Sequence, residues 1–257
     1  MSKIVSFGDS FIFGYEIPEN YNGSAGWPGI AAKKLNIEFE CKASPGSSNS
    51  SICRRILDYY SDKNNLNDLA VINWTWSHRW AYFVNKNNWN KWINLGPKNF
   101  KKTNIFYSSL ENDMIDFKTK RIKSGQMPNA TGIDEDYQKQ LQNMYIEYIS
   151  DNQMFNKFLS LQSIYCATAF LMNNNIKFVQ TNMDGEILEK KWFNDGYIDV
   201  LQNYISLYLS SFDNKNFLDW CREKNFKITK KSWHPLEDAH DAAADYWLPM
   251  YKKILNL

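Results

Sequence analysis

Short apolar runs that alternate with helix-forming stretches are the feature that most restricts how this chain can fold. In chain order, the runs and the stretches between them lie at 3–7, 26–36, 37–43, 52–62 and 68–76. Consecutive strand–helix–strand units of this kind form a parallel sheet with right-handed crossovers. The first 76 residues therefore predict an α/β fold whose ligand sites lie at the carboxyl ends of the strands.

The alternating pattern is interrupted and then resumes. Residues 77–135 are rich in Trp, Asn and Lys and show few clear periods, so they predict a helical or irregular insertion after the third strand. Helical spacing returns over 136–173, and a fourth strand is expected at 176–182. A terminal helix is expected over 236–255, bent or ended near Pro249.

The length of 257 residues suits one sizeable α/β domain that carries an insertion. No Gly-, Ser- or Pro-rich linker marks a boundary, so we expect a single domain over 1–257 with an aromatic-rich insertion at about 77–135. The 30 Lys and Arg residues nearly balance the 28 Asp and Glu residues, giving a net charge of +2. Such a chain has no global field to attract nucleic acid or an anionic membrane, and a small-molecule or glycan ligand fits better.

Several other classes of site and location are disfavoured by missing patterns. The four cysteines are widely spread, without metal-ligand spacing, and neither a GxGxxG nor a Walker motif occurs, so we expect no metal and no cofactor. No apolar segment approaches the roughly 20 residues that span a bilayer, and the N-terminus lacks the pattern of a signal peptide. We expect a cytoplasmic protein, and the Lys- and Asn-rich composition suits a phage or viral gene.

Ser10 is the first candidate for chemistry, because Gly8, Asp9 and Ser10 end the first apolar run abruptly. A turn or cap residue is the commoner role for a serine there, and a nucleophile also needs a base within about 3 Å. Among the three histidines, His234 directly precedes Pro235, whose fixed φ stiffens the loop. His234 is thus the candidate base, with a helix-entry residue as the alternative interpretation.

Three blocks of sequence resemble motifs of the SGNH hydrolases, also known as the GDSL family. The block FGDSFIFG at 7–14 resembles their first motif, SPGSSN at 44–49 looks like the second, and HPLEDAH at 234–240 looks like the last. Three blocks in the right order are more specific than any one of them. The resemblance implies a three-layer α/β/α sandwich with a flavodoxin-like sheet, and serine esterase, lipase or acyl-transfer chemistry.

The resemblance also implies roles for individual residues. Ser10 would attack an ester carbonyl, and His234 would remove its proton and later protonate the leaving alcohol. The backbone N–H groups of Ser10 and Gly46 would hold the oxyanion.

The third motif of the family, Gly-x-Asn-Asp after the third strand, is not matched. Aligning the strand places Thr75 at the glycine, Ser77 at the asparagine and His78 at the aspartate. Ser77 is the candidate oxyanion donor, with Thr75 as an alternative and Asn73 as another if the strand ends early. Losing one such donor costs about 10²–10³ in rate, so an unreplaced asparagine predicts a slow enzyme.

The catalytic acid of the family is also missing, since its position, three residues before the histidine, holds Lys231. A main-chain carbonyl in the 230–234 loop is the expected partner of the ring, giving a Ser-His dyad. Asp184, just past the fourth strand, is the leading substitute carboxylate, with Glu237 and Asp238 behind it.

Aromatic residues crowd the segment after the third strand. They predict either the core of a lid or a stacking platform for sugar rings or acyl chains, in which Trp76, Trp80 and Tyr82 would bind substrate. We expect a serine hydrolase that cleaves a small ester, with an O-acetylated carbohydrate as the candidate substrate. The alternative is a weak or inactive carbohydrate-binding or assembly module of the same fold.

Overall fold

A computed structural model of the chain describes residues 2–20, 22–86, 89–97, 106–110, 140, 143–150, 152–189, 196–230 and 232–257. Its centre is a four-stranded sheet in the order β2-β1-β3-β7, and every neighbouring pair is parallel. The strands are β1 (Ile4–Gly8), β2 (Phe39–Cys41), β3 (Leu69–Trp74) and β7 (Phe178–Asn182). β1 and β3 are buried along their whole length, as their continuous apolar runs predicted.

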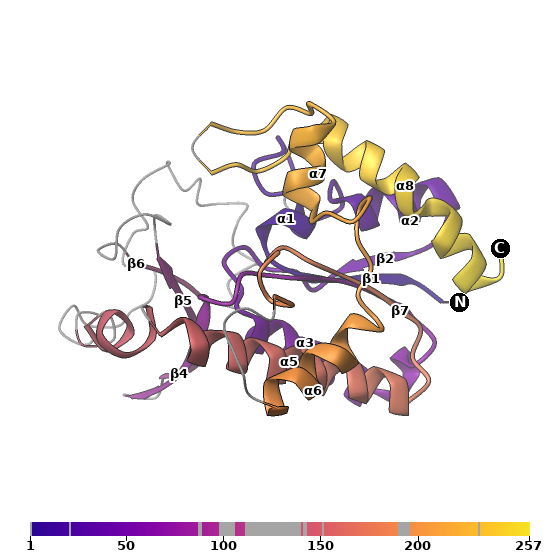
Figure 1. The fold of residues 1–257 in the computed structure, drawn as a ribbon. Helices are drawn as coiled ribbons and strands as arrows, with labels where there is room; N and C mark the ends of the chain where they lie inside the picture. The colour runs from indigo at the N-terminus through magenta and orange to yellow at the C-terminus, as the bar shows by residue number, and fades with distance from the viewer. Residues whose placement is uncertain are drawn as a thin grey trace.

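Helices cover both faces of the sheet and make three layers (Figure 1). One layer holds α1 (Ser10–Phe13), α2 (Trp27–Leu35), α7 (Phe217–Glu223) and α8 (Glu237–Leu255); the other holds α3 (Asn49–Ser61), α5 (Gln153–Asn173) and α6 (Gly196–Ser206). Successive strand residues alternate between the two cores, with Ile4 in the first and Val5 in the second. The predicted α/β/α sandwich is confirmed.

The strand order determines where a ligand site can form. From β1 the chain crosses to β2 on one side and then returns to β3 on the other side of β1, as in a flavodoxin-like sheet. Gly8 of β1 pairs with Asn73 of β3, so both strands end at the same edge. The loops that follow β1 and β3 therefore start at the point where the strand order of the sheet reverses. Doubly wound sheets bind their ligands at such a point.

The terminal helix α8 covers almost the whole of its expected range, and the structure excludes one of the two alternatives given for Pro249. Instead of ending there, the helix continues to Leu255. Trp247 and Tyr251, on either side of the proline, are both buried in the core beneath α8. Packing of this face offsets the hydrogen bond that a proline removes from a helix interior.

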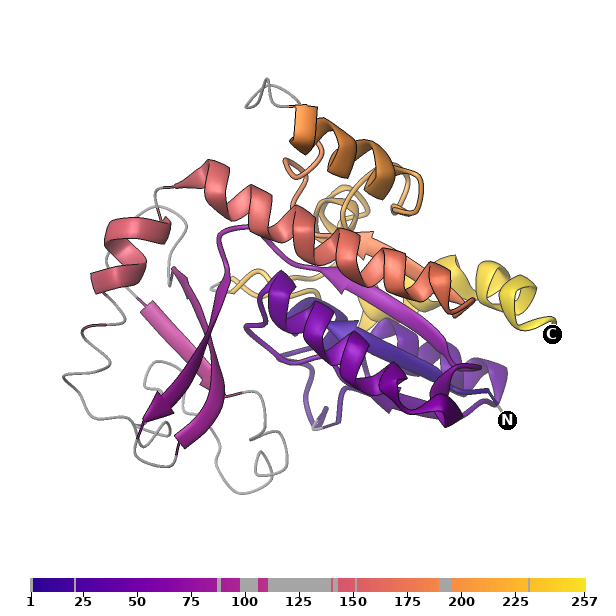
Figure 2. The same ribbon diagram turned by 90° about the horizontal axis from the view of Figure 1, so that it is seen from below.

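The insertion after β3 is more regular than the sequence indicated. Its described part forms an antiparallel sheet of β4 (Trp80–Lys86), β5 (Trp89–Pro97) and β6 (Phe106–Leu110), in that order (Figure 2). Aromatic and β-branched residues in these strands favour extended backbone, but interspersed Asn and Lys hide the alternation that would have predicted it. The rest of the expected insertion, 111–135, lies outside the described residues.

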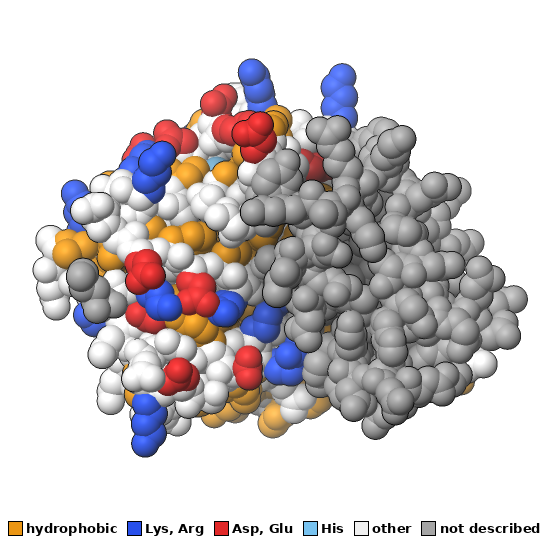
Figure 3. Space-filling model, turned by 180° about the vertical axis from the view of Figure 1, so that it is seen from behind, with side chains coloured by type: hydrophobic (Ala, Val, Ile, Leu, Met, Phe, Trp, Pro, Cys, Tyr) orange, Lys and Arg blue, Asp and Glu red, His pale blue; other side chains and the backbone are white. Residues whose placement is uncertain are grey.

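Two short helices, η1 (Lys63–Asn65) and the π-helical η3 (Tyr145–Ser150), complete the described elements. Within the described part of the chain, no helix is both long and apolar enough to cross a bilayer. Acidic and basic side chains are interspersed over the described surface that Figure 3 shows.

Candidate active site

Ser10 is the first residue of α1, a single helical turn that begins where β1 ends. Asp9 caps this turn, because its Oδ1 accepts a hydrogen bond of 3.0 Å from the N–H of Phe11. Gly8 makes the tight exit from the strand with a φ of +154°, and a Cβ there would lie 2.5 Å from Ile12 Cγ2 and 2.7 Å from the carbonyl oxygen of Asn73. Only glycine fits this position, which explains the abrupt Gly-Asp-Ser end of the first apolar run.

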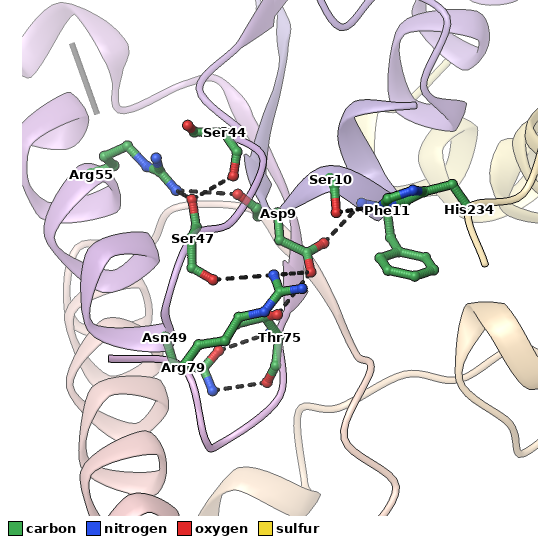
Figure 4. Close-up of polar contacts among 11 residues, drawn as sticks. Asp9, Ser10, Phe11, Ser44, Ser47, Asn49, Arg55, Thr75, Arg79 and His234 are labelled. Atoms are coloured by element: carbon green, nitrogen blue, oxygen red, sulfur yellow. Dashed lines mark hydrogen bonds and ion pairs between the residues drawn. The ribbon is translucent and has the colours of Figure 1, made fainter. Parts of the chain in front are cut away.

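His234 and Ser10 point toward one another across the site (Figure 4). The ring Nε2 lies 2.8 Å from Ser10 Oγ, so the structure brings the two predicted residues into hydrogen-bond contact. The backbone around the histidine is held by Thr229, whose Oγ1 accepts from the N–H of His234 at 3.0 Å. The ring packs 4.8 Å from Phe11 and 5.4 Å from Tyr15, measured between centroids. A rigid base thus faces a buried serine hydroxyl.

Glu16 holds the other side of the imidazole. Its Oε2 lies 3.0 Å from His234 Nδ1 and accepts a 2.9 Å hydrogen bond from Thr229 Oγ1, and Ser232 Oγ also donates to it. The hydrogen bond with His234 is the largest cause that lowers the pKa of Glu16 to about 2, with Ser232 and Thr229 adding to it against the effect of burial. This carboxylate is therefore ionised at neutral pH and oriented toward the ring.

The predictions for the group that faces His234 Nδ1 were therefore wrong. Neither a main-chain carbonyl nor Asp184 faces Nδ1, because Glu16 occupies that place. Asp184 instead accepts hydrogen bonds from the N–H groups of Ser77 at 3.0 Å and of Glu186 at 3.1 Å. Asp184 thus joins the segment after β3 to the segment after β7. The other two candidate acids, Glu237 and Asp238, are exposed in the first turn of α8.

The other two histidines are held neutral by burial. Desolvation lowers the pKa of both His78 and His240 to about 3. His240 Nδ1 accepts a 3.2 Å hydrogen bond from the N–H of Trp27, which joins α8 to the start of α2. Of the three histidines, only His234 contacts Ser10.

The two backbone groups expected to bind an oxyanion are available. Ser44 N–H donates to the carbonyl of Gly8 at 3.0 Å, which brings the loop of the second motif against the end of β1. Gly46 follows in this loop with a φ of +82°. Within the described part of the chain, the N–H groups of Ser10 and Gly46 have no hydrogen-bond partner.

The side chains proposed to replace the missing asparagine are differently placed. Thr75 Oγ1 donates to Asp9 Oδ2 at 2.8 Å, and Asn73 is buried against Thr181, whose Oγ1 donates to its Oδ1 at 2.8 Å. Ser77 is tied through its backbone to Asp184, away from β1. The hydroxyl of Thr75 is thus already bonded, whereas the buried Nδ2 of Asn73, the group that would donate, has no hydrogen-bond partner within the described part of the chain.

Asn49, the last residue of the second motif, joins that motif to the end of β3. Its Nδ2 donates to the carbonyl of Thr75 at 2.9 Å, and its Oδ1 accepts from the N–H of Thr75 at 2.8 Å. A single buried amide therefore pairs with the backbone as a neighbouring strand would. The sequence showed this asparagine in the motif but not its partner.

Two arginines that the sequence did not single out enter the site (Figure 4). Arg79 NH1 lies 2.9 Å from Oδ2 of the fully buried Asp9. Arg55 donates through NH2 to the carbonyl of Gly8 at 3.1 Å and to Ser47 Oγ at 2.6 Å. Burial lowers the pKa of Arg55 to about 9.

Of the three aromatic residues expected to bind substrate, Trp76 is brought to the site. Its ring lies 5.1 Å from Phe11, which in turn contacts His234. Trp80 is half-buried at the start of β4. The side chain of Tyr82 lies outside the described residues.

Comparisons with known proteins find similarity in structure alone. No protein-family profile and no curated protein matches the chain. A putative lipolytic protein of the G-D-S-L family from Desulfitobacterium hafniense matches with 12% identity and a TM-score of 0.43, over 97% of this chain and 99% of that one. A carbohydrate esterase with divergent catalytic and non-catalytic binding functions matches with 12% identity and a TM-score of 0.49, over 99% and 66%.

A family two carbohydrate esterase from Clostridium thermocellum, solved with cellohexaose, matches with 14% identity and a TM-score of 0.43, over 99% of this chain and 65% of that one. A lipolytic protein of the G-D-S-L family is thus among the structures similar to this chain. Because these three TM-scores are below 0.5, the chemistry of this chain has to follow from its own residues.

Proposed function

We propose that the protein is a serine hydrolase that cleaves an ester through Ser10, His234 and Glu16. One observation carries the proposal: a serine hydroxyl, an imidazole and a carboxylate are joined in sequence by contacts of 2.8 and 3.0 Å. A serine hydroxyl is a weak nucleophile by itself, and a base oriented by a third group is what activates it.

In the proposed reaction, Ser10 Oγ attacks the ester carbonyl carbon while His234 Nε2 takes the hydroxyl proton. The oxyanion of the tetrahedral intermediate accepts hydrogen bonds from the N–H groups of Ser10 and Gly46. His234 then gives its proton to the departing alcohol oxygen, which leaves an acyl group on Ser10. Water, deprotonated by His234, attacks this acyl group, and the released serine oxygen recovers the proton.

Glu16 stabilises the imidazolium that forms during both steps. A charge-assisted hydrogen bond is roughly twice as strong as a neutral one, so a carboxylate serves better here than the main-chain carbonyl expected from the sequence. The Glu16 side chain is 36% exposed, and solvent therefore screens part of this interaction.

For the substrate we propose a small acyl ester of a carbohydrate. Phe11 and Tyr15 pack against the His234 ring beside the buried Ser10, which favours a short acyl group. Trp76 is half-buried next to Phe11 and has the guanidinium of Arg79 over its ring, and the exposed remainder of its side chain is the aromatic surface that we propose for contact with the sugar.

The competing function, carbohydrate binding without turnover, was motivated by the missing acid and the missing asparagine. Glu16 supplies the acid that the sequence analysis did not find, so hydrolysis is the better-supported function. The test is acetate release from acetylated xylan and hydrolysis of 4-nitrophenyl acetate by the purified protein, with Ser10→Ala as the control. Turnover that this variant lacks supports the proposal. A folded wild-type protein with no activity on 4-nitrophenyl esters from acetate to octanoate would contradict it.

A further inference from the structure

We infer that Arg79 is the third oxyanion donor of this site, where a guanidinium takes the role of the missing asparagine amide. The inference rests on the proposed ester hydrolysis and adds a catalytic residue to it. Arg79 belongs to no motif block identified in the sequence.

The position of the guanidinium is the first reason. Arg79 NH1 lies 2.9 Å from Asp9 Oδ2 and 3.5 Å from the carbonyl oxygen of Ser47. Asp9 directly precedes Ser10, and Ser47 directly follows Gly46. The guanidinium therefore bridges the two segments whose N–H groups are expected to bind the oxyanion.

The guanidinium is also held rigidly. Its carbon lies 5.0 Å from the centroid of the Trp76 ring, and the Arg79 side chain is only 11% exposed. Asp9 is fixed in turn by Thr75 Oγ1 and by the N–H of Phe11. A donor that is oriented before the reaction needs no reorganisation when charge develops on the substrate.

The Arg79 guanidinium has more N–H groups than its hydrogen bonds within the described chain use. A guanidinium carries five N–H groups, and within the described part of the chain the hydrogen bonds of Arg79 involve NH1 alone. For Arg55 the unpaired nitrogens, Nε and NH1, are buried where no ligand reaches them, whereas none of the Arg79 nitrogens is among the buried unpaired atoms. In the proposed site, the remaining N–H groups of Arg79 are the ones that donate to the oxyanion.

The charge environment of the site is positive. Asp9 pairs directly with Arg79, and the buried guanidinium of Arg55 contacts the carbonyl of Gly8 nearby. A strong N–H donor close to Ser10 is useful, because negative charge appears on the carbonyl oxygen only in the transition state.

The test separates oxyanion binding from simple neutralisation of Asp9. It measures kcat and KM for 4-nitrophenyl acetate in wild type, Arg79→Met, Asp9→Asn and the double variant. We expect Arg79→Met to lower kcat by about 10²–10³ with KM within a few-fold of wild type, as for loss of one oxyanion donor. The double variant should stay well below Asp9→Asn, because the donor is still missing.

Recovery of the double variant to the rate of Asp9→Asn would overturn the inference, since Arg79 would then only neutralise a buried charge. An Arg79→Met variant within three-fold of wild type would overturn it as well. Thermal unfolding checks each variant, and Arg79→Lys, which keeps the charge beside Asp9 but loses the forked donors, replaces Arg79→Met if the latter does not fold. The lysine variant should also lose kcat, and wild-type kcat in it would contradict the inference.

A second readout uses phenylboronic acid, which forms a tetrahedral adduct with an activated serine. Binding should weaken in Arg79→Met by a factor similar to the loss in kcat, while unchanged binding would overturn the inference. An inactive wild type would instead refute the proposed hydrolysis itself, and the role of Arg79 with it. The two failures are therefore distinguishable.

Discussion

Glu16 Oε2 lies 3.0 Å from His234 Nδ1, although 218 residues separate the two in the chain. Glu16 follows the short helix that carries Ser10, so one segment of 7 residues presents both the nucleophile candidate and the acid. The backbone of Glu16 has a φ of +72°, a conformation that few side chains other than glycine adopt.

The first prediction concerns the identity of the acid. Glu16→Gln should lower kcat for 4-nitrophenyl acetate by about 10²–10⁴, because the amide cannot stabilise an imidazolium as a carboxylate does. Asp184→Asn is the matched control and should stay within a few-fold of wild type, since its partners are backbone N–H groups of Ser77 and Glu186. Equal losses in the two variants would contradict the assignment of Glu16.

The second prediction concerns stability in acid. The pKa of Glu16 is lowered in the folded protein from 4.5 to about 2, so its contribution to stability is complete above about pH 4.5 and is lost as the pH falls toward 2. The difference in free energy of unfolding between wild type and Glu16→Gln should therefore shrink between pH 5 and pH 2. Urea titrations across this range measure it. A difference that stays constant throughout would show that Glu16 is not ionised in a hydrogen-bonded state.

The third prediction concerns the turn that presents Ser10. Gly8→Ala should destabilise the protein by about 1–3 kcal/mol, the usual cost of overpacking, because the new Cβ would overlap Ile12 and the backbone of Asn73. It should also reduce turnover, since α1 moves with the strand end. Gly185→Ala is the control, because a Cβ there meets nothing within 4 Å. Similar melting temperatures for the two variants would refute this account of the turn.

The fold was largely predictable because its signals are local. The apolar runs of β1 and β3 can be recognised within a few residues of sequence. The antiparallel sheet β4–β6 was missed because polar residues interrupt its alternation. The terminal helix was predicted over nearly its full length, but whether it ended at Pro249 was left open because that depends on tertiary packing.

The site was predictable only in part, for a related reason. Ser10 and His234 stand in motif blocks with a resemblance to a known family, and the structure brings them together. The roles proposed for Glu16 and Arg79 depend on contacts with His234 and Asp9, residues far away in the sequence. No sequence pattern predicts these contacts, because the folded sheet is what brings the partners together. The available cue was that Glu16 lies two residues after the first motif block.

Covalent labelling of Ser10 by a fluorophosphonate tests the central claim most directly, because the reagent reacts with a serine only when a base activates its hydroxyl. Intact mass and peptide mapping should show one adduct, on Ser10, in the wild type, and none in Ser10→Ala or in a folded His234→Ala variant. Two results would contradict the claim that Ser10 and His234 form an activated pair: a folded wild type that takes no label, or a His234→Ala variant that is labelled on Ser10 as fast as the wild type.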